Sequence, residues 1–212
     1  VWLVLGQPSP DPSHWDSISP YFLSHTRPEG GGANAVNVII VDFRGFDTLG
    51  EIAVMAIAAL IIHALLSGWS PPQAVQHAST APPLMLQLAA RLLLPFACLI
   101  SLYFFLRGHN LPGGGFIAGL VLALALMLMH VAHGHAWADA RAPRDALPWA
   151  GWGLLIATVT GIAAWFFGAP FLTSTYDYPW LPGVGSVPLA SASLFDLGVY
   201  LVVTGATLVM LL

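Results

Sequence analysis

Three charged side chains stand at the start of a long apolar run, where they could move ions. Arg44, Asp47 and Glu51 are spaced i, i+3 and i+7, so a helix places them on one face. The spacing allows an Arg–Asp ion pair, with Glu51 one turn deeper. Uncompensated acids cost about 2.5–3.5 kcal/mol in a membrane helix, and carboxylates shielded from water exchange protons near neutral pH. The pattern predicts a proton or cation relay; the alternative is an interfacial anchor, because the helix dipole favours acids in the first turn.

Four more ionisable residues are candidates for the same ion path, namely Asp42, His63, Arg91 and Asp196. Asp42 precedes the first three, and His63 lies roughly 120° around the helix from Glu51. His63 either hydrogen-bonds within the bundle or passes protons. Arg91 falls inside an apolar run, so it needs an acidic partner, for which Glu51 and Asp196 are the candidates, or it reaches the membrane interface. Asp196 opens another apolar run, where the helix dipole alone would also explain it.

The stretch GHNLPGGGF at 108–116 separates two long apolar runs. Proline cannot continue the preceding helix, and the glycines adopt backbone angles closed to other residues and let helices approach closely. Lys and Ser/Thr are missing and no strand precedes it, so it is not a nucleotide-binding loop. The sequence predicts a tight hairpin, with the alternative of a polar cap over an ion path. The hairpin residues are His109, Asn110, Pro112, Gly113, Gly114, Gly115 and Phe116.

The remaining cysteine and histidines do not indicate a metal centre. His130, His133 and His135 are spaced so that only the first two share a helix face, which is too few ligands for a closed site. Cys98 is the one cysteine of the chain, so no disulfide forms within it. We predict no metal site.

Five stretches are long and apolar enough to cross a membrane, which takes about 20 residues. They are 46–67, 85–107, 115–134, 148–168 and 192–212. They are apolar on all faces rather than alternating, which argues against strands. Residues 6–33, 68–84 and 169–191 are polar and rich in Pro, Gly or Ser, so we expect irregular surface segments there. The predicted fold is an all-α integral membrane protein with about five transmembrane helices and irregular N-terminal and inter-helix loops.

The overall composition supports this fold. Of 212 residues, 57% are hydrophobic and only 8% charged, whereas soluble domains carry about 25% charged residues. Lipid must therefore cover much of the surface. The net charge of −4 argues against nucleic-acid binding. Both ends of the sequence are apolar, so we expect it to be a segment of a longer polypeptide.

Two motifs resemble one family. The run FLRGHNLPGGGFIAGLV is similar to the signature of the B-type (MnhB-like) subunit of Mrp-type multisubunit sodium/proton antiporters. The run GGGANAVNVIIVDFRGFDTLGEIAVMAIAAL resembles the C-terminal segment of the large A-type subunit of that complex. Many members carry these as two proteins, and here they are joined as in A/B fusions. We therefore divide the chain into residues 1–79, a surface loop and one transmembrane helix, and 80–212, four transmembrane helices with the hairpin.

The resemblance implies a complex of the bacterial cell (inner) membrane that exchanges cytoplasmic sodium for external protons. The chain would be a secondary antiporter component rather than an enzyme, with Na⁺ and H⁺ transported and no cofactors. Its partners would be the rest of the A-type subunit, the C-, D-, E-, F- and G-type subunits of such complexes, and the lipid bilayer. One alternative is an assembly protein without its own ion path. Another is the related ion-translocating module of a membrane-bound hydrogenase or complex-I-like enzyme.

Overall fold

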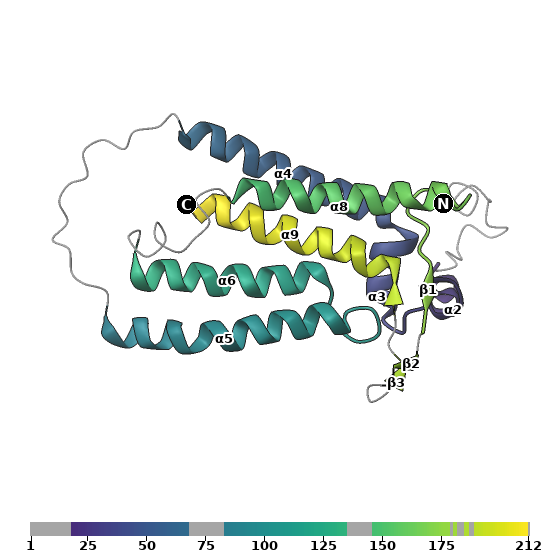
Figure 1. Cartoon of the computed structure of the whole chain (residues 1–212), viewed down its shortest axis with the longest axis horizontal. Coiled ribbons are helices and arrows are strands. Elements are labelled where there is room, and N and C mark those ends of the chain that lie inside the picture. The colour runs from purple at the N-terminus through teal and green to yellow at the C-terminus, as the bar shows by residue number, and fades with distance from the viewer. Residues whose placement is uncertain are drawn as a thin grey trace, which may run out of the picture.

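The computed structural model describes residues 18–67, 83–134, 146–178, 180–181, 185–186 and 189–211. Five helices cross the length of the molecule, as the sequence predicted (Figure 1). They are α4 (Gly45–Ser67), α5 (Leu84–Arg107), α6 (Gly115–His133), α8 (Leu147–Phe166) and α9 (Ser191–Leu211). Consecutive spans run in opposite directions, so the hairpin after α5 and the starts of α4 and α9 share one end of the bundle. We call it the hairpin end.

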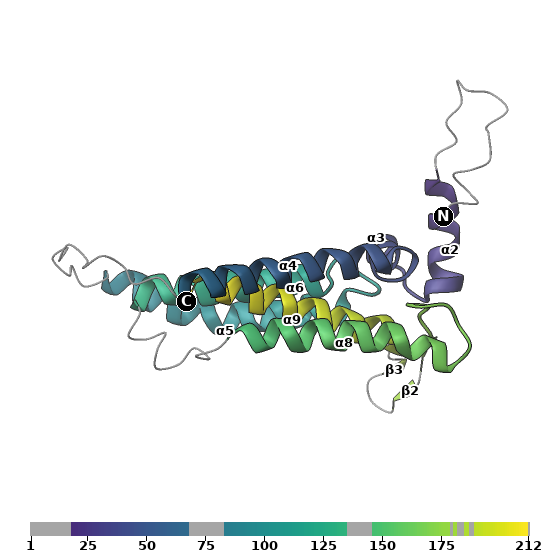
Figure 2. The same cartoon turned by 90° about the horizontal axis from the view of Figure 1, so that it is seen from above.

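Helix α9 is the centre of the bundle. It packs against α8, α6 and α4, whereas α5 packs mainly against α6. Figure 2 shows α9 between α4 and α8, and Figure 1 shows α6 between α5 and α9. The α9 residues Ala192, Phe195, Val199, Val202 and Val203 make up five of the nine buried residues of the largest core cluster in the described part of the chain. The inner helix is thus enclosed by protein, and the outer helices leave apolar side chains exposed.

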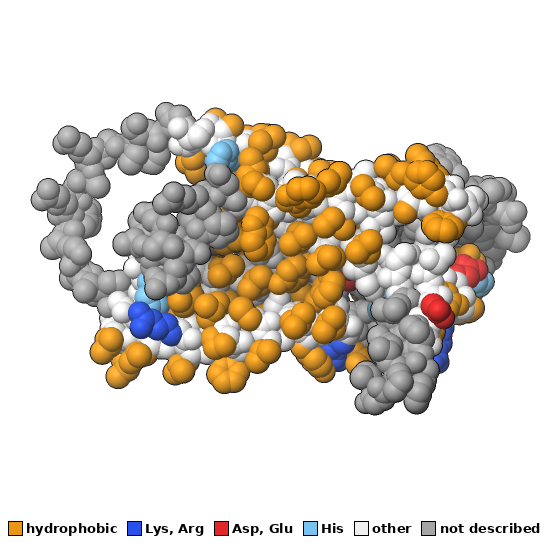
Figure 3. Space-filling model, in the orientation of Figure 1, with side chains coloured by type: hydrophobic (Ala, Val, Ile, Leu, Met, Phe, Trp, Pro, Cys, Tyr) orange, Lys and Arg blue, Asp and Glu red, His pale blue; other side chains and the backbone are white. Residues whose placement is uncertain are grey.

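The outer surface matches a lipid environment. Figure 3 shows hydrophobic side chains across the middle of one face, with charged and histidine side chains toward the two ends. This distribution is typical of a bundle whose middle lies in hydrocarbon, because charged groups are costly there.

Short helices precede α4 at the hairpin end. They are α2 (Ser19–Gly30), α3 (Ala35–Val38) and the π-helix η1 (Ile39–Phe43). The expectation of irregular structure over 6–33 is wrong for Ser19–Gly30; residues 6–17 lie outside the described part. Prolines did not prevent this helix: Pro20 stands in its first turn, where no backbone N–H is needed, and Pro28 lies in its last turn. Its end is fixed by Gly31, which adopts the left-handed conformation.

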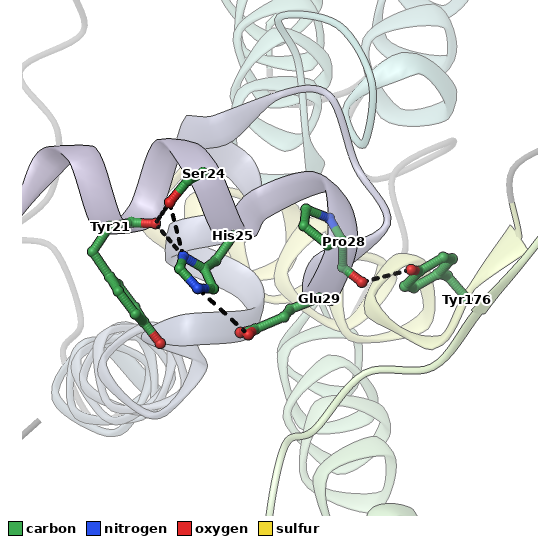
Figure 4. A network of polar contacts seen from close by, with 6 residues as sticks. All are labelled: Tyr21, Ser24, His25, Pro28, Glu29 and Tyr176. Atoms are coloured by element: carbon green, nitrogen blue, oxygen red, sulfur yellow. Dashed lines mark hydrogen bonds and ion pairs between the residues drawn. The ribbon is translucent and has the colours of Figure 1, made fainter.

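Side-chain contacts hold α2 in place (Figure 4). Along the helix, the hydroxyl of Ser24 donates to the Tyr21 carbonyl at 2.9 Å, and the His25 ring faces Glu29 at 4.0 Å. Across the fold, the Tyr176 hydroxyl donates to the Pro28 carbonyl at 2.7 Å. This last contact ties α2 to the segment between α8 and α9.

That segment contains short strands instead of a wholly irregular linker. Strand β1 (Tyr176–Asp177) pairs antiparallel with β4 (Leu189–Ala190), and β2 (Trp180–Leu181) pairs with β3 (Gly185–Ser186). Each strand has two residues, so the fold remains helical.

Candidate functional site

The glycine-rich stretch forms the predicted hairpin between α5 and α6. The backbone N–H of Leu111 donates to the Arg107 carbonyl at 2.9 Å, and that of Gly114 donates to the Phe104 carbonyl at 3.0 Å. Gly114 has φ of 121°, a conformation that other residues adopt only with strain. The sequence-based expectation that this turn needs glycine is confirmed.

Gly115 starts α6 directly against α9. A Cβ at Gly115 would collide with the backbone carbonyl of Asp196 and lie 3.0 Å from its carboxylate. Glycine therefore allows the start of α6 to approach Asp196. The expected close approach of helices after the hairpin is confirmed here.

The hairpin is fastened to the loop between α2 and α3. The Asn34 side-chain amide donates to the carbonyls of Gly108 at 2.8 Å and Leu111 at 2.9 Å. In return, the Asn110 side-chain oxygen accepts from the Ala33 N–H at 3.1 Å. Because Asn34 also caps α3, the same residue sets the position of α3 relative to the hairpin.

A π-helical turn joins α3 to α4. The wider turn frees backbone carbonyls from the usual helical pattern. The buried Thr48 hydroxyl donates to the carbonyl of Ile40 at 2.7 Å. Thr48 of α4 thus satisfies a backbone carbonyl of η1, and this bond holds the α3–η1 segment against α4.

Asp196 is the buried carboxylate of the site. It is 6% exposed, on the first turns of α9. Its hydrogen-bond partners are the backbone N–H of Gly115 and the side chain of Asn37, which is also buried. The carboxylate therefore connects the starts of α6 and α9 with α3.

A cavity of about 220 Å³ lies between α4 and α6, and we call it the α4–α6 cavity. Its inner wall includes the buried residues Asn37, Thr48 and Asp196. Glu51 lies at its outer side and is exposed in this chain. Exposed apolar side chains complete the outer rim, namely Val36, Ile40, Phe116 and Ile117. Two carboxylates from different spans thus border one cavity, and oxygen atoms of this kind can hold a proton or a hard cation.

Arg44 and Asp47 form the ion pair that their spacing predicted. The Arg44 Nε donates to the Asp47 carboxylate at 2.6 Å, and both side chains are more than half exposed. Neither lines the α4–α6 cavity. Of the three acids near the start of α4, Glu51 alone borders this cavity; Asp42 borders a second one beside Phe46 and Phe171.

Asp42 and His109 are a second pair of titratable groups at the hairpin end. Burial raises the pKa of Asp42, although the Ser174 N–H donates to its carboxylate at 3.2 Å and the nearby His109 also favours the charged form. Burial lowers the pKa of His109, and Asp42 opposes that change. Both groups are therefore pushed toward their neutral forms.

The structure places His63 and Arg91 at the opposite end of the bundle from the cavity. The Arg91 Nε donates to the His133 Nε2 at 2.9 Å, so the expectation of Glu51 or Asp196 as its partner is wrong. The reason is the antiparallel course of the spans, which puts the start of α5 beside the end of α6. His63 is exposed near the end of α4.

The predicted absence of a metal site is untested. Among the described residues, no group of three or more potential ligands could hold a metal ion. His135 lies outside the described part of the chain.

The sequence reasoning missed Asn37 and Thr48 as site residues. An uncharged polar side chain costs little free energy in a membrane helix. The sequence therefore does not single it out, as it does an acid in an apolar run. A weak signal was the polar residue at Asn37 within an apolar segment, spaced i, i+3 from Asn34.

The fold defines a multi-pass integral membrane protein, with the buried carboxylate of Asp196 where α6 meets α9. A family model described as the domain related to the MnhB subunit of Na⁺/H⁺ antiporters matches residues 85–209. A second model, MbhE of the MBH complex, matches residues 8–81. The chain belongs to the MnhB family, a family of transporter subunits rather than enzymes.

Similar proteins match either the whole chain or part of it. A probable K⁺/H⁺ antiporter protein of the combined A/B type from Rhizobium meliloti is 44% identical over 100% of this chain. The chain spans 23% of that protein's length. The B-type protein of the Na⁺/H⁺ antiporter of Bacillus subtilis is 46% identical over 59% of this chain and 87% of its own length.

Two solved assemblies contain chains of similar structure. One is the Mrp complex from Dietzia, with a TM-score of 0.76 and 33% identity over 92% of this chain and 22% of that one. The other is the membrane-bound sulfane sulfur reductase, an archaeal respiratory membrane complex. It aligns with a TM-score of 0.69 and 31% identity over 99% of this chain and 92% of that one.

Proposed function

We propose that this chain is a membrane segment of a multisubunit sodium/proton antiporter in the bacterial cell membrane. It works with the rest of the A-type subunit and with C-, D-, E-, F- and G-type subunits. The similarity to the A/B-type protein of Rhizobium meliloti over the whole chain supports this assignment. Within the complex, the segment contributes to the ion path and to assembly.

The observation that carries the proposal is the α4–α6 cavity, which Glu51 and Asp196 share. Glu51 is six residues into α4, about 9 Å from Gly45 along the helix axis. A carboxylate kept at such a place costs several kcal/mol unless water or polar groups reach it, at about 2.5–3.5 kcal/mol on insertion scales. The cavity provides room for water beside it, and Asn37 and Thr48 provide polar atoms.

The chemistry required of these residues is modest. A carboxylate in a small hydrated cavity binds a proton or a Na⁺ ion through the same oxygen atoms, so the two compete for one site. Such competition is the basis of exchange. In this proposal Na⁺ and H⁺ are the transported ions and no resident cofactor takes part. The exposed pair Arg44–Asp47 lies at the same end and sets the local charge near the entrance.

The test is the substitution Glu51→Gln in the complete complex, reconstituted in vesicles. Gln keeps the size of the side chain and removes its charge. We expect sodium-driven pH change to fall by about tenfold or more, as for removal of a positioned proton-transfer group. Glu29→Gln on α2 is the matched control, because Glu29 is exposed and outside the spans.

An assembly protein without an ion path predicts a different result. In that case Glu51→Gln leaves transport unchanged as long as the complex assembles, which size-exclusion chromatography of the purified complex measures. Normal assembly together with unchanged transport would reject the ion-path role.

The second candidate is the ion-translocating module of an electron-transfer complex. The likeness to the sulfane sulfur reductase chain and to MbhE favours it. The two functions differ in their driving force. Sodium-driven pH change in vesicles without any electron donor or acceptor supports the antiporter, and transport that requires a redox reaction supports the second candidate.

A further inference from the structure

We propose that the mouth of the α4–α6 cavity is the docking site for a transmembrane helix of another subunit, which brings a hydrogen-bond donor to Glu51. The inference rests on the proposed function, since it requires assembly into a larger complex. It goes further by assigning the contact surface and the chemistry of the partner.

One wall of the cavity is closed by buried residues of this chain, and the opposite side is open. Toward α9, the polar wall is buried, and its residues Asn37, Thr48 and Asp196 are at most 8% exposed. Toward the outside, the rim is apolar and exposed, from 43% at Ile40 to 67% at Val36. The molecule thus presents an apolar rim around polar groups beside the first turns of the candidate membrane-spanning helix α4.

Glu51 lacks a partner on this open side. Within the described part of the chain, neither an ion pair nor a hydrogen bond reaches its carboxylate. Acyl chains provide no donor, and an unpaired acid is costly in hydrocarbon. Membrane helices satisfy such groups by hydrogen bonds from neighbouring helices. The partner at this position is therefore a helix with a donor side chain.

The dimensions of the cavity fit side chains rather than a whole helix. Its 220 Å³ would hold about seven waters at about 30 Å³ each. A helix lying across the mouth would insert one or two side chains, in the manner of knobs into holes. Beside Glu51, the surface of α4 is open at Gly50, where an added Cβ would meet nothing within 4 Å. This gap allows a neighbouring backbone to come close.

A second copy of this chain does not meet the requirement. Symmetric pairing through this surface would place two Glu51 side chains together, and like charges would force the two to share one proton. Neither carboxylate could then exchange ions independently, as the proposed function requires. The partner chemistry is therefore that of a different transmembrane helix.

The experiment is site-specific photo-crosslinking in the intact complex in membranes. A benzophenone amino acid replaces Val36 or Phe116 at the rim, or Leu99 on the outer face of α5 as the control. Leu99 is 65% exposed, comparable with Val36 at 67%. Mass spectrometry of the purified complex identifies the crosslinked peptide.

We expect both rim positions to crosslink to one transmembrane helix of another subunit of the complex. The yield should exceed that of Leu99 at least about fivefold, because packed helices exclude lipid. Glu51→Leu should lower the rim yield about fivefold, and Glu51→Gln should retain it, because the Gln side-chain carbonyl still accepts the donated hydrogen bond. Crosslinks to lipid or to a second copy of this chain, or rim yields no higher than that of Leu99, would each overturn the proposal.

The two proposals fail in distinguishable ways. If the rim crosslinks to a partner helix but Glu51→Gln transports normally, docking stands and the ion path is wrong. If Glu51→Gln stops transport while the rim contacts only lipid, the ion path stands and docking is wrong.

Discussion

Helices α9 and α4 border the same cavity, yet they present their carboxylates in opposite ways. Asp196 of α9 is buried and hydrogen-bonded by groups of this chain, whereas Glu51 of α4 is exposed and unpaired within the described residues. The helices differ likewise as a whole, since 61% of the apolar stretch of α9 is buried, against 11% for α4. The carboxylate on α9 therefore has its hydrogen-bond partners within this chain. In our proposal the carboxylate on α4 receives its partner from another subunit.

The largest expected effect tests this difference at the two acids. Asp196→Leu leaves the Asn37 amide and the Gly115 N–H buried without an acceptor, at about 1–3 kcal/mol each. We expect it to destabilise the folded protein by about 3 kcal/mol in denaturant unfolding in detergent. Asp47→Leu, in an exposed ion pair, should change stability by less than about 0.5 kcal/mol. Equal effects would contradict the view that only the α9 side is closed.

Two glycines provide the next comparison. Gly114→Ala places a Cβ at φ of 121° and 2.6 Å from the Asn37 side-chain oxygen, and should cost about 2 kcal/mol. Gly50→Ala meets open space, so helix propensity should stabilise the isolated chain by up to about 1 kcal/mol. Thermal unfolding of both variants measures this contrast. A loss of stability for Gly50→Ala in the isolated chain would show that the α4 surface is already filled.

Thr48 links the two sides through η1. Thr48→Val removes the hydrogen bond to the Ile40 carbonyl and should cost about 1 kcal/mol. Thr48→Ser keeps the hydroxyl and should recover most of that loss in the same unfolding assay. If the two variants are equally stable, the π-helical turn does not depend on this bond.

The smallest expected effects are pH dependences at the hairpin end. The pKa of Asp42 is raised above 3.8 in the fold, so near that pH the folded state binds more protons than the unfolded state. Stability therefore falls as the pH rises from 3.8 through the raised pKa of the folded state. The pKa of His109 is lowered below 6.5, so stability falls as the pH drops below 6.5. Asp42→Asn should remove the first loss and His109→Gln the second, measured as Tm against pH. An unchanged profile in either variant would contradict the assigned direction.

Sequence reasoning succeeded where a residue type is costly or restricted. The spans followed from hydrophobicity and length, and the Arg44–Asp47 pair followed from helical spacing. The need for glycine in the hairpin followed from the backbone angles a tight turn requires, as the φ of Gly114 shows.

Sequence reasoning was less successful for features that depend on which distant segments pack together. Arg91 was expected beside an acid but bonds His133, because pairing between spans is not visible in either span alone. Residues 19–30 read as irregular because Pro, Ser and Gly predominate nearby, yet they form α2 against η1, where the rings of Phe22 and Phe43 lie 5.5 Å apart. Asn37 and Thr48 gave little sign of their roles, since uncharged polar residues are common in helices.

Composition and order of residues were sufficient for a five-span membrane protein with a glycine hairpin and acids near one end of its spans. These properties depend on local energies, namely transfer into hydrocarbon and the backbone angles open to each residue. Which of the two acids, Asp196 or Glu51, is buried depended on packing between helices. Asp196 is enclosed because α6 begins on a glycine that lets it meet α9. Glu51 stays on the open side because α4 packs against α9 and α8 and buries other residues, such as Ile52 and Ala59. Contacts between segments far apart in the chain made that choice, and no local pattern encodes them.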